Sequence, residues 1–217
     1  MRGLLIKDFM LLKNQLNYFA ILCLSLILII VLKNASFIIG YMTYLCAMFT
    51  LSTMSYDEFD NGMVFLMSLP VKRKDYILEK YVFGFIVGLM GWFISVVLSV
   101  VYEMIASSQT DIQELFITSV FILCILIIIL SILIPIELQF GSEKSRIAFF
   151  AIVGSLMALG YLIKSIITSM NIDMLKIIQP FLSLDVVYMI MIGLIIALVF
   201  LLVSYQISYK IIHKKEF

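Results

Sequence analysis

Charged residues are scarce in this chain. They make up 13% of the 217 residues, whereas ordinary globular proteins contain about 25%. Apolar residues make up 64%, and the mean hydropathy is +1.16. A soluble domain of this length cannot hide so much apolar surface, so lipid must surround most of the chain. The net charge of +1 leaves no basic field for a phosphate backbone, which excludes nucleic acid as a partner.

Histidine and cysteine, the usual metal-binding and redox residues, are also rare. The single histidine is His213 near the C-terminus, and Cys23, Cys46 and Cys124 all lie inside apolar runs. This pattern predicts no disulfide framework, no metal site and no intramembrane catalytic site. The segment 141–145 lacks the glycines of a phosphate-binding loop. We therefore predict that the chain is not an enzyme and binds no cofactor itself.

Six apolar runs are long enough to cross a bilayer as helices, which takes roughly 17 to 25 residues. They cover residues 16–32, 37–55, 81–102, 115–138, 147–163 and 186–205. The runs are continuous rather than alternating, which favours helices over a membrane barrel. The first run contains no Ala-x-Ala-like cleavage site, so we expect a retained span and not a removed signal peptide. The sequence predicts an all-α polytopic membrane protein made of one transmembrane domain over residues 1–217.

The basic residues are distributed unevenly between the two sides of these spans. Twelve of the fifteen Lys and Arg residues fall on one side, and only Lys33, Lys164 and Lys176 fall on the other. Because positive loops stay in the cytoplasm, both termini are predicted to be cytoplasmic.

No ionisable residue lies near the middle of a predicted span. Glu103 and Glu137 are near span ends, where exposure at the membrane interface accounts for them. A carboxylate that serves an ion pathway normally lies inside a span. The pattern therefore argues against proton or sodium coupling through a buried carboxylate.

Residues 1–15 are too polar to span the membrane but are predicted to form an amphipathic helix in the cytoplasmic interface. Lys7 and Asn14 are expected on the polar side of this helix. The predicted apolar stripe consists of Leu5, Phe9, Leu12 and Leu16.

The segment 56–80 is the longest cytoplasmic connection. Ser55 and Glu58 have the spacing of a capping box, which predicts a helix starting here with acidic residues in its first turn. This short helix would run from about Asp57 to Met67 and end before Pro70. Its expected apolar face consists of Phe59, Met63, Leu66 and Met67. Such a helix either docks a cytoplasmic partner or packs against lipid and its own bundle.

Two further patterns concern how the spans turn and pack. Pro135 is expected to kink the fourth span, and Gly141 to allow a tight turn into the fifth. In the third span, Gly84, Gly88 and Gly91 present small residues on one helix face. Small residues let helices approach closely, and packing within the chain is favoured over a dimer interface.

Several of these segments together resemble ABC-2 type transporter permeases. The resemblance rests on Lys7-Asp8, the stretch from Ser55 to Phe59, Ser68-Leu-Pro-Val-Lys-Arg-Lys-Asp-Tyr76 with Lys80-Tyr81, and the turn from Pro135 to Arg146. Within that family the chain is most similar to small bacterial permeases associated with export of phenol-soluble modulins and with resistance to antimicrobial peptides.

The resemblance implies that the chain is a permease in the bacterial cytoplasmic membrane. Two permease copies would form a complex with two copies of a separate ATP-binding cassette ATPase. That ATPase would bind ATP and Mg²⁺, and the cargo would be an amphipathic peptide. The segment 57–67 would be the coupling helix, and residues 1–15 the connecting helix. The implied ATPase-docking residues are Asp57, Glu58, Phe59, Met63, Leu66, Pro70, Arg73, Gly141, Glu143 and Arg146.

The second span is the most polar of the six. By resemblance it lines the substrate path, through Tyr41, Tyr44, Met48 and Ser52, although ordinary helix packing explains the same residues. Two alternatives to peptide export remain. One is an ABC-2 exporter of another cargo, such as sodium, a lantibiotic or a drug. The other is a membrane scaffold or sensor without transport.

Overall fold

The computed structural model describes residues 2–14, 34–59, 62–69, 72–106, 112–169 and 185–215. Within these ranges every regular element is a helix, which confirms the predicted all-α class. The helices are α1 (Arg2–Asn14), α3 (Ala35–Glu58), α4 (Gly62–Ser68), α5 (Arg73–Ala106), α6 (Ile112–Ser169) and α8 (Val186–Lys214).

Four segments of the described helices are long and apolar enough to cross a membrane. They are Ser36–Glu58, Arg73–Ile105, Gln113–Ser142 and Val186–Lys214, and they contain the predicted second, third, fourth and sixth spans. The predicted fifth span is helical, but its apolar part, Ile147–Leu162, is shorter. The predicted first span, 16–32, lies outside the described residues. The count of six spans and the orientation of the termini therefore stay predictions.

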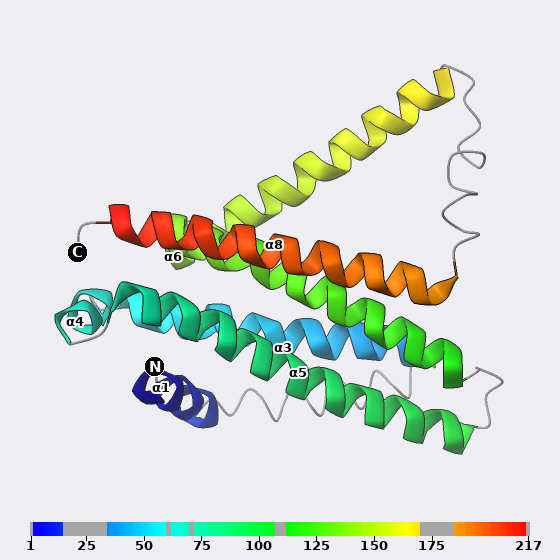
Figure 1. The fold of residues 1–217 in the computed structure, drawn as a ribbon, viewed down its shortest axis with the longest axis horizontal. Helices are drawn as coiled ribbons and strands as arrows, with labels where there is room; N and C mark the ends of the chain where they lie inside the picture. The colour runs from blue at the N-terminus through cyan, green and yellow to red at the C-terminus, as the bar shows by residue number, and fades with distance from the viewer. Residues whose placement is uncertain are drawn as a thin grey trace.

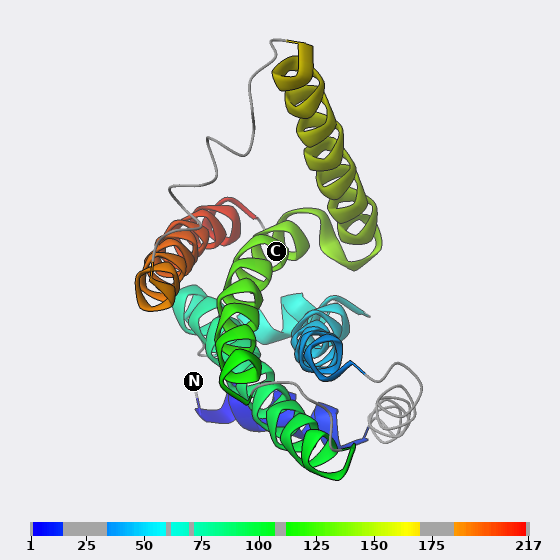
Figure 2. The same ribbon diagram turned by 90° about the vertical axis from the view of Figure 1, so that its right-hand side faces the viewer.

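The long helices form a bundle around α3, α5 and α6. Helix α3 packs most extensively against α5 and α6, and α8 covers α6 and part of α5 (Figures 1 and 2). The main core lies at one end of this bundle, where Met54, Tyr76, Ile77 and Ile134 are almost completely buried. Helix α1 lies across the same end and contacts α5 and α3. We call this end, which also holds α4 and the C-terminus of α8, the α4 end (Figure 1).

The glycines of α5 allow the close approach of its neighbours in the same chain. A Cβ added at Gly84 would lie 2.9 Å from the Thr50 hydroxyl of α3, and one at Gly88 would lie 2.8 Å from Leu126 of α6. A larger residue at either position would force these neighbouring side chains to move, so glycine permits the observed close packing. Gly84 and Gly88 therefore pack against helices of the same chain, and the preference for such packing over a dimer interface stays a prediction.

Helix α6 changes direction at Gly141, as the sequence predicts for that glycine. Its φ of 77° and ψ of 171° are non-helical and belong to a region that side chains other than glycine avoid. Pro135 lies inside the helix, and the non-helical backbone is at Gly141. Beyond Gly141, the second half of α6 diverges from the bundle (Figure 1).

The predicted helix start at Ser55 is wrong. Helix α3 continues through Ser55 to Glu58, and the backbone N–H of Phe59 donates to the Ser55 carbonyl as the helix ends. The Ser55 hydroxyl donates instead to Glu137, at 3.2 Å. A separate short helix, α4, begins only at Gly62. Partners on other helices hold these polar side chains, which overrides the local capping pattern.

Helix α1 contacts the bundle through a side that carries charged residues. Leu4 and Asp8 are the buried residues of this helix, whereas Phe9 is 37% exposed and touches the ring of Phe83 by its edge. Lys7, expected on the polar side, forms ion pairs with Asp8 of the same helix and with Asp57 of α3. The contacts of Leu4, Lys7 and Asp8 fix α1 to the bundle, and the position of its apolar stripe in the membrane interface stays a prediction.

Candidate functional site

Helix α4 has two faces with different surroundings. Met63 and Leu66 are 8% exposed and belong to the main core, so they fasten α4 to the bundle. Val64 and Phe65 lie on the other face, and Phe65 is 67% exposed. Packing of α4 against its own bundle accounts for the first face and leaves the second apolar face uncovered.

Residues flanking α4 extend this apolar surface. Phe59 is 72% exposed at the end of α3, and Leu69 follows α4 with 42% of its surface exposed. A groove of about 670 Å³ runs between α1 and α4, and its walls include Leu11, Tyr56 and Phe65. We call Tyr56, Phe59, Val64, Phe65 and Leu69 the α4 surface.

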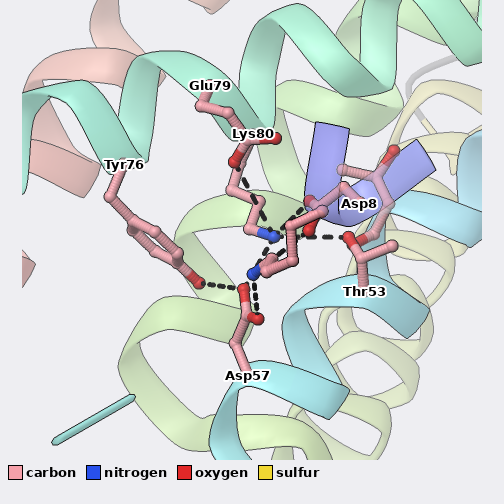
Figure 3. Close-up of polar contacts among 8 residues, drawn as sticks. Asp8, Thr53, Asp57, Tyr76, Glu79 and Lys80 are labelled. Carbon is pink, nitrogen blue, oxygen red and sulfur yellow. Dashed lines mark hydrogen bonds and ion pairs between the residues drawn. The ribbon is translucent and has the colours of Figure 1, made fainter. Parts of the chain in front are cut away.

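A buried ionic cluster lies where α1, α3 and α5 meet (Figure 3). The Lys80 ammonium of α5 is fully buried and lies 2.5 Å from Asp8 Oδ2 and 2.7 Å from Asp57 Oδ2. It also lies 3.4 Å from the Thr53 hydroxyl and 3.8 Å from Glu79 Oε2. One lysine thus joins α1, α3 and α5.

A second lysine and a tyrosine complete the cluster. Lys7 of α1 donates to Asp57 Oδ1 and lies 3.2 Å from Asp8 Oδ1. The Tyr76 hydroxyl donates to Asp57 Oδ2 at 3.2 Å. Burial alone would raise the pKa of Asp8, but the neighbouring charges of Lys80 and Lys7 hold that pKa below its usual value. Asp8 is therefore an anion that ties α1 to the bundle.

Glu58 joins the end of α3 to the turn at Gly141. Its Oε2 accepts the backbone N–H of Ser142 at 2.7 Å, where the second half of α6 begins. A carboxylate at this position stabilises a helix N-terminus. A Cβ at position 141 would lie 2.9 Å from the same carboxylate oxygen, so the contact needs glycine. The Lys215 ammonium is 4.0 Å from the other oxygen of Glu58.

Arg73 binds the C-terminus of α8. Its Nη1 donates to the carbonyl oxygens of Ile212 at 2.9 Å and of His213 and Lys215 at 3.2 Å each. A guanidinium at this point satisfies carbonyls that the helix leaves open and complements the helix dipole. The start of α5 and the end of α8 are therefore fastened together at the α4 end.

A cavity of about 330 Å³ lies between α3 and the two halves of α6. Tyr44, Met48 and Ser52 contribute to its wall from α3, as do Phe149 and Phe150 from the second half of α6. Glu137, expected at the exposed interface, is instead buried and also contributes to this wall. The cavity therefore combines a mostly apolar and aromatic wall with a few polar groups.

Residues 3–213 match the model of a protein family described as ABC-2 family transporter protein. The chain belongs to the ABC-2 transporter family. No curated protein and no solved structure matches it. The family match confirms the predicted family and a transport role as a multi-pass membrane permease. The similarity of this ABC-2 permease to peptide-exporting members stays a prediction.

The structure brings most of the predicted ATPase-docking residues of the permease to the α4 end but gives them different surroundings. Phe59 is exposed, while Met63, Leu66 and Asp57 face the bundle. Arg73 and Glu58 contact other helices, as described above. Pro70 and the side chains of Glu143 and Arg146 lie outside the described residues.

The predicted substrate-path residues of the permease divide in a similar way. Tyr44, Met48 and Ser52 share the cavity beside α6. Tyr41 is not among its wall residues, and its ring stacks on Phe37 with the centroids 6.1 Å apart.

The ionic cluster of the permease is not predicted by the sequence patterns. The charge asymmetry places Lys7 and Lys80 on the cytoplasmic side and gives no role to Asp8 or Glu79. A signal was present, because Lys7-Asp8 and Lys80-Tyr81 are among the segments that resemble the family. A lysine directly at the start of an apolar run is compatible with a buried ion pair as well as with a surface charge.

Proposed function

We propose that this chain is the permease subunit of an ATP-driven exporter and that α4 is its coupling helix. The observation that carries this proposal is the division of α4 into a bundle-facing side and an exposed apolar side. A coupling helix has to be fixed to the moving bundle and also fit a partner. Met63 and Leu66 fix α4 to the bundle, and the exposed side chains of Val64 and Phe65 are available to a partner.

The partner in this proposal is a separate ATP-binding cassette ATPase, which binds ATP and Mg²⁺ and docks on the α4 surface. Exposed aromatic side chains such as Phe59, Phe65 and Tyr56 are typical anchors of protein interfaces. Asp57 is not part of this surface because it lies in the ionic cluster. This revises the docking set that the resemblance implies.

Contacts at the α4 end supply a route for movement. Closure of two ATPase subunits on ATP would displace α4 as a rigid body. The Lys80 cluster would carry the displacement to α1, α3 and α5, and the bond from Ser142 to Glu58 would carry it to the second half of α6. The bundle would then shift between inward-open and outward-open populations.

The proposed cargo is an amphipathic peptide, moved by two permease copies in the bacterial cytoplasmic membrane. The cavity formed by Tyr44, Met48 and Ser52 supports this choice, because methionine and aromatic residues adapt to varied apolar surfaces while hydroxyls bind polar groups. Peptide-stimulated ATP hydrolysis by the reconstituted complex tests the cargo. A response to sodium or to a small drug instead of to amphipathic peptides would contradict this part of the proposal.

Coexpression with a candidate ATPase tests the coupling helix. We expect Phe65→Asp to abolish copurification of the ATPase while the thermal stability of the permease stays unchanged, because Phe65 is exposed. Lys13→Asp is the control, since Lys13 is exposed on α1 and does not belong to the α4 surface. An intact complex with normal coupled ATP hydrolysis in Phe65→Asp would refute the assignment. No ATPase bound even to the wild type would favour the scaffold or sensor alternative.

A further inference from the structure

The ionic cluster contains more acidic than basic side chains. Asp8, Asp57 and Glu79 contribute three carboxyl groups, and Lys7 and Lys80 contribute two ammonium groups. The three acidic residues and Lys80 are at most 5% exposed. An uncompensated buried charge is strongly unfavourable. With all five groups ionised, the cluster would carry one uncompensated negative charge.

The unpartnered oxygen atoms show where the imbalance lies. Both carboxyl oxygens of Glu79 are buried without a hydrogen-bond partner, and the Lys80 ammonium lies 3.8 Å from Oε2. The Asp8 carboxylate faces the same Lys80 ammonium, at 2.5 Å. Two carboxylates cannot bond to each other, because both only accept; a carboxylic acid and a carboxylate can. One proton would therefore remove the excess charge and supply a partner for the unsatisfied oxygens.

We propose that this cluster is a proton-binding site in which Glu79 carries the proton and donates it in a hydrogen bond to the Asp8 carboxylate. The bound ligand is a proton and not a metal ion, because the Lys80 ammonium already occupies the position between the three carboxyl groups. Two aspartates then balance two lysines. A pair of neighbouring carboxyl groups that share one proton is a well-established arrangement.

The surroundings of Glu79 come from three helices. Helix α1 supplies Lys7 and Asp8, α3 supplies Asp57, and α5 supplies Tyr76 and Lys80. The acceptor, Asp8, belongs to α1, so the site is complete only while α1 is docked on the bundle (Figure 3). Separation of α1 from α5 would release the proton. The site lies at the α4 end and not midway along a span, so it senses the docking of α1 and is not an ion pathway.

Infrared difference spectroscopy on the full-length permease in lipid vesicles, without any ATPase, tests this site. The carbonyl stretch of a protonated carboxylic acid is distinct from that of a carboxylate. We expect such a band in the wild type at neutral pH and its loss in Glu79→Gln. Glu114→Gln is the control, because Glu114 is exposed on α6, and this variant should keep the band. Glu79→Gln should also keep the thermal stability of the wild type, since its amide can donate to Asp8 as the acid does.

Asp8→Asn tests the pairing without removing Glu79. With an amide at position 8, two carboxyl groups face two ammonium groups, so Glu79 should ionise and the acid band should disappear. Absence of the band from the wild type, or its persistence in Glu79→Gln or in Asp8→Asn, would overturn the proposal. Because no ATPase is present, none of these results depends on the coupling-helix assignment.

Discussion

The Lys80 ammonium lies 2.5 Å from Asp8 Oδ2, and neither side chain is exposed to solvent. These residues are far apart in the chain and belong to α5 and α1. Asp57 lies on the other side of the same ammonium, at 2.7 Å. This arrangement fixes the N-terminal helix to the bundle at the end where α4 projects.

Removal of the central cation should destabilise the permease strongly. Lys80→Met leaves Asp8 and Asp57 buried with one cation fewer, and breaking a buried ion pair in this way costs about 3–5 kcal/mol. Unfolding of the purified protein in detergent, followed by helical circular dichroism, measures the loss. Lys214→Met is the control, because Lys214 is exposed near the end of α8. Equal stability of Lys80→Met and the wild type would show that the cluster does not hold α1 in place.

Acid should weaken the attachment of α1. The pKa of Asp8 is lowered in the folded protein by Lys80 and Lys7, whereas an unfolded aspartate titrates near about 3.9. The contribution of Asp8 is thus complete above that value and is lost as the pH falls through the lower folded pKa. The difference in unfolding temperature between the wild type and Asp8→Asn should therefore shrink in the acid range. A difference that grows with acidification would contradict the sign of the shift.

Close packing of α5 on α3 should make Gly91 intolerant of a side chain. A Cβ at position 91 would lie 2.6 Å from Cys46 Cβ, so Gly91→Ala forces the two helices apart. Overpacking of this kind costs about 1–3 kcal/mol. Gly154→Ala is a matched control in the second half of α6, where nothing lies within 4 Å of the added carbon. Thermal unfolding of both variants compares them, and equal losses would refute the close approach at Gly91.

The contact of Arg73 with α8 should protect the end of that helix. Arg73→Met removes the donor to the carbonyls of Ile212, His213 and Lys215. The amides in the last turn of α8 should then exchange faster with deuterated water, while those in the middle of α8 remain protected. Arg2→Met, at an exposed position of α1, should leave this exchange unchanged. Unaltered protection in Arg73→Met would mean that the contact does not stabilise the helix end.

The long helices of this fold could be predicted from the sequence because continuous apolar runs of this length are typical of membrane helices. The runs 37–55, 81–102, 115–138 and 186–205 all fall within described helices. Gly141 was equally predictable, since a break between two apolar helices needs a residue that accepts positive φ. Local composition suffices for these features.

The arrangement of the α4 end could not be predicted in the same way. Ser55, Asp57 and Glu58 form a good local start signal for a helix, but α3 continues through them. Their side chains bind Glu137, the two lysines and Ser142, which lie far away in the sequence. The sequence marks Lys7-Asp8 and Lys80-Tyr81 as segments of the family but does not pair them, so the buried cluster appears only once α1, α3 and α5 are assembled.

The most direct test of the account is site-specific photo-crosslinking from α4 in membranes that contain the permease and its ATPase. A photoreactive amino acid is placed at position 65, on the exposed side of α4, or at position 63, on the side that faces the bundle. We expect position 65 to crosslink to the ATPase and position 63 to crosslink within the permease. An assembled, active complex in which position 65 never crosslinks to the ATPase would contradict the proposal that α4 is the coupling helix.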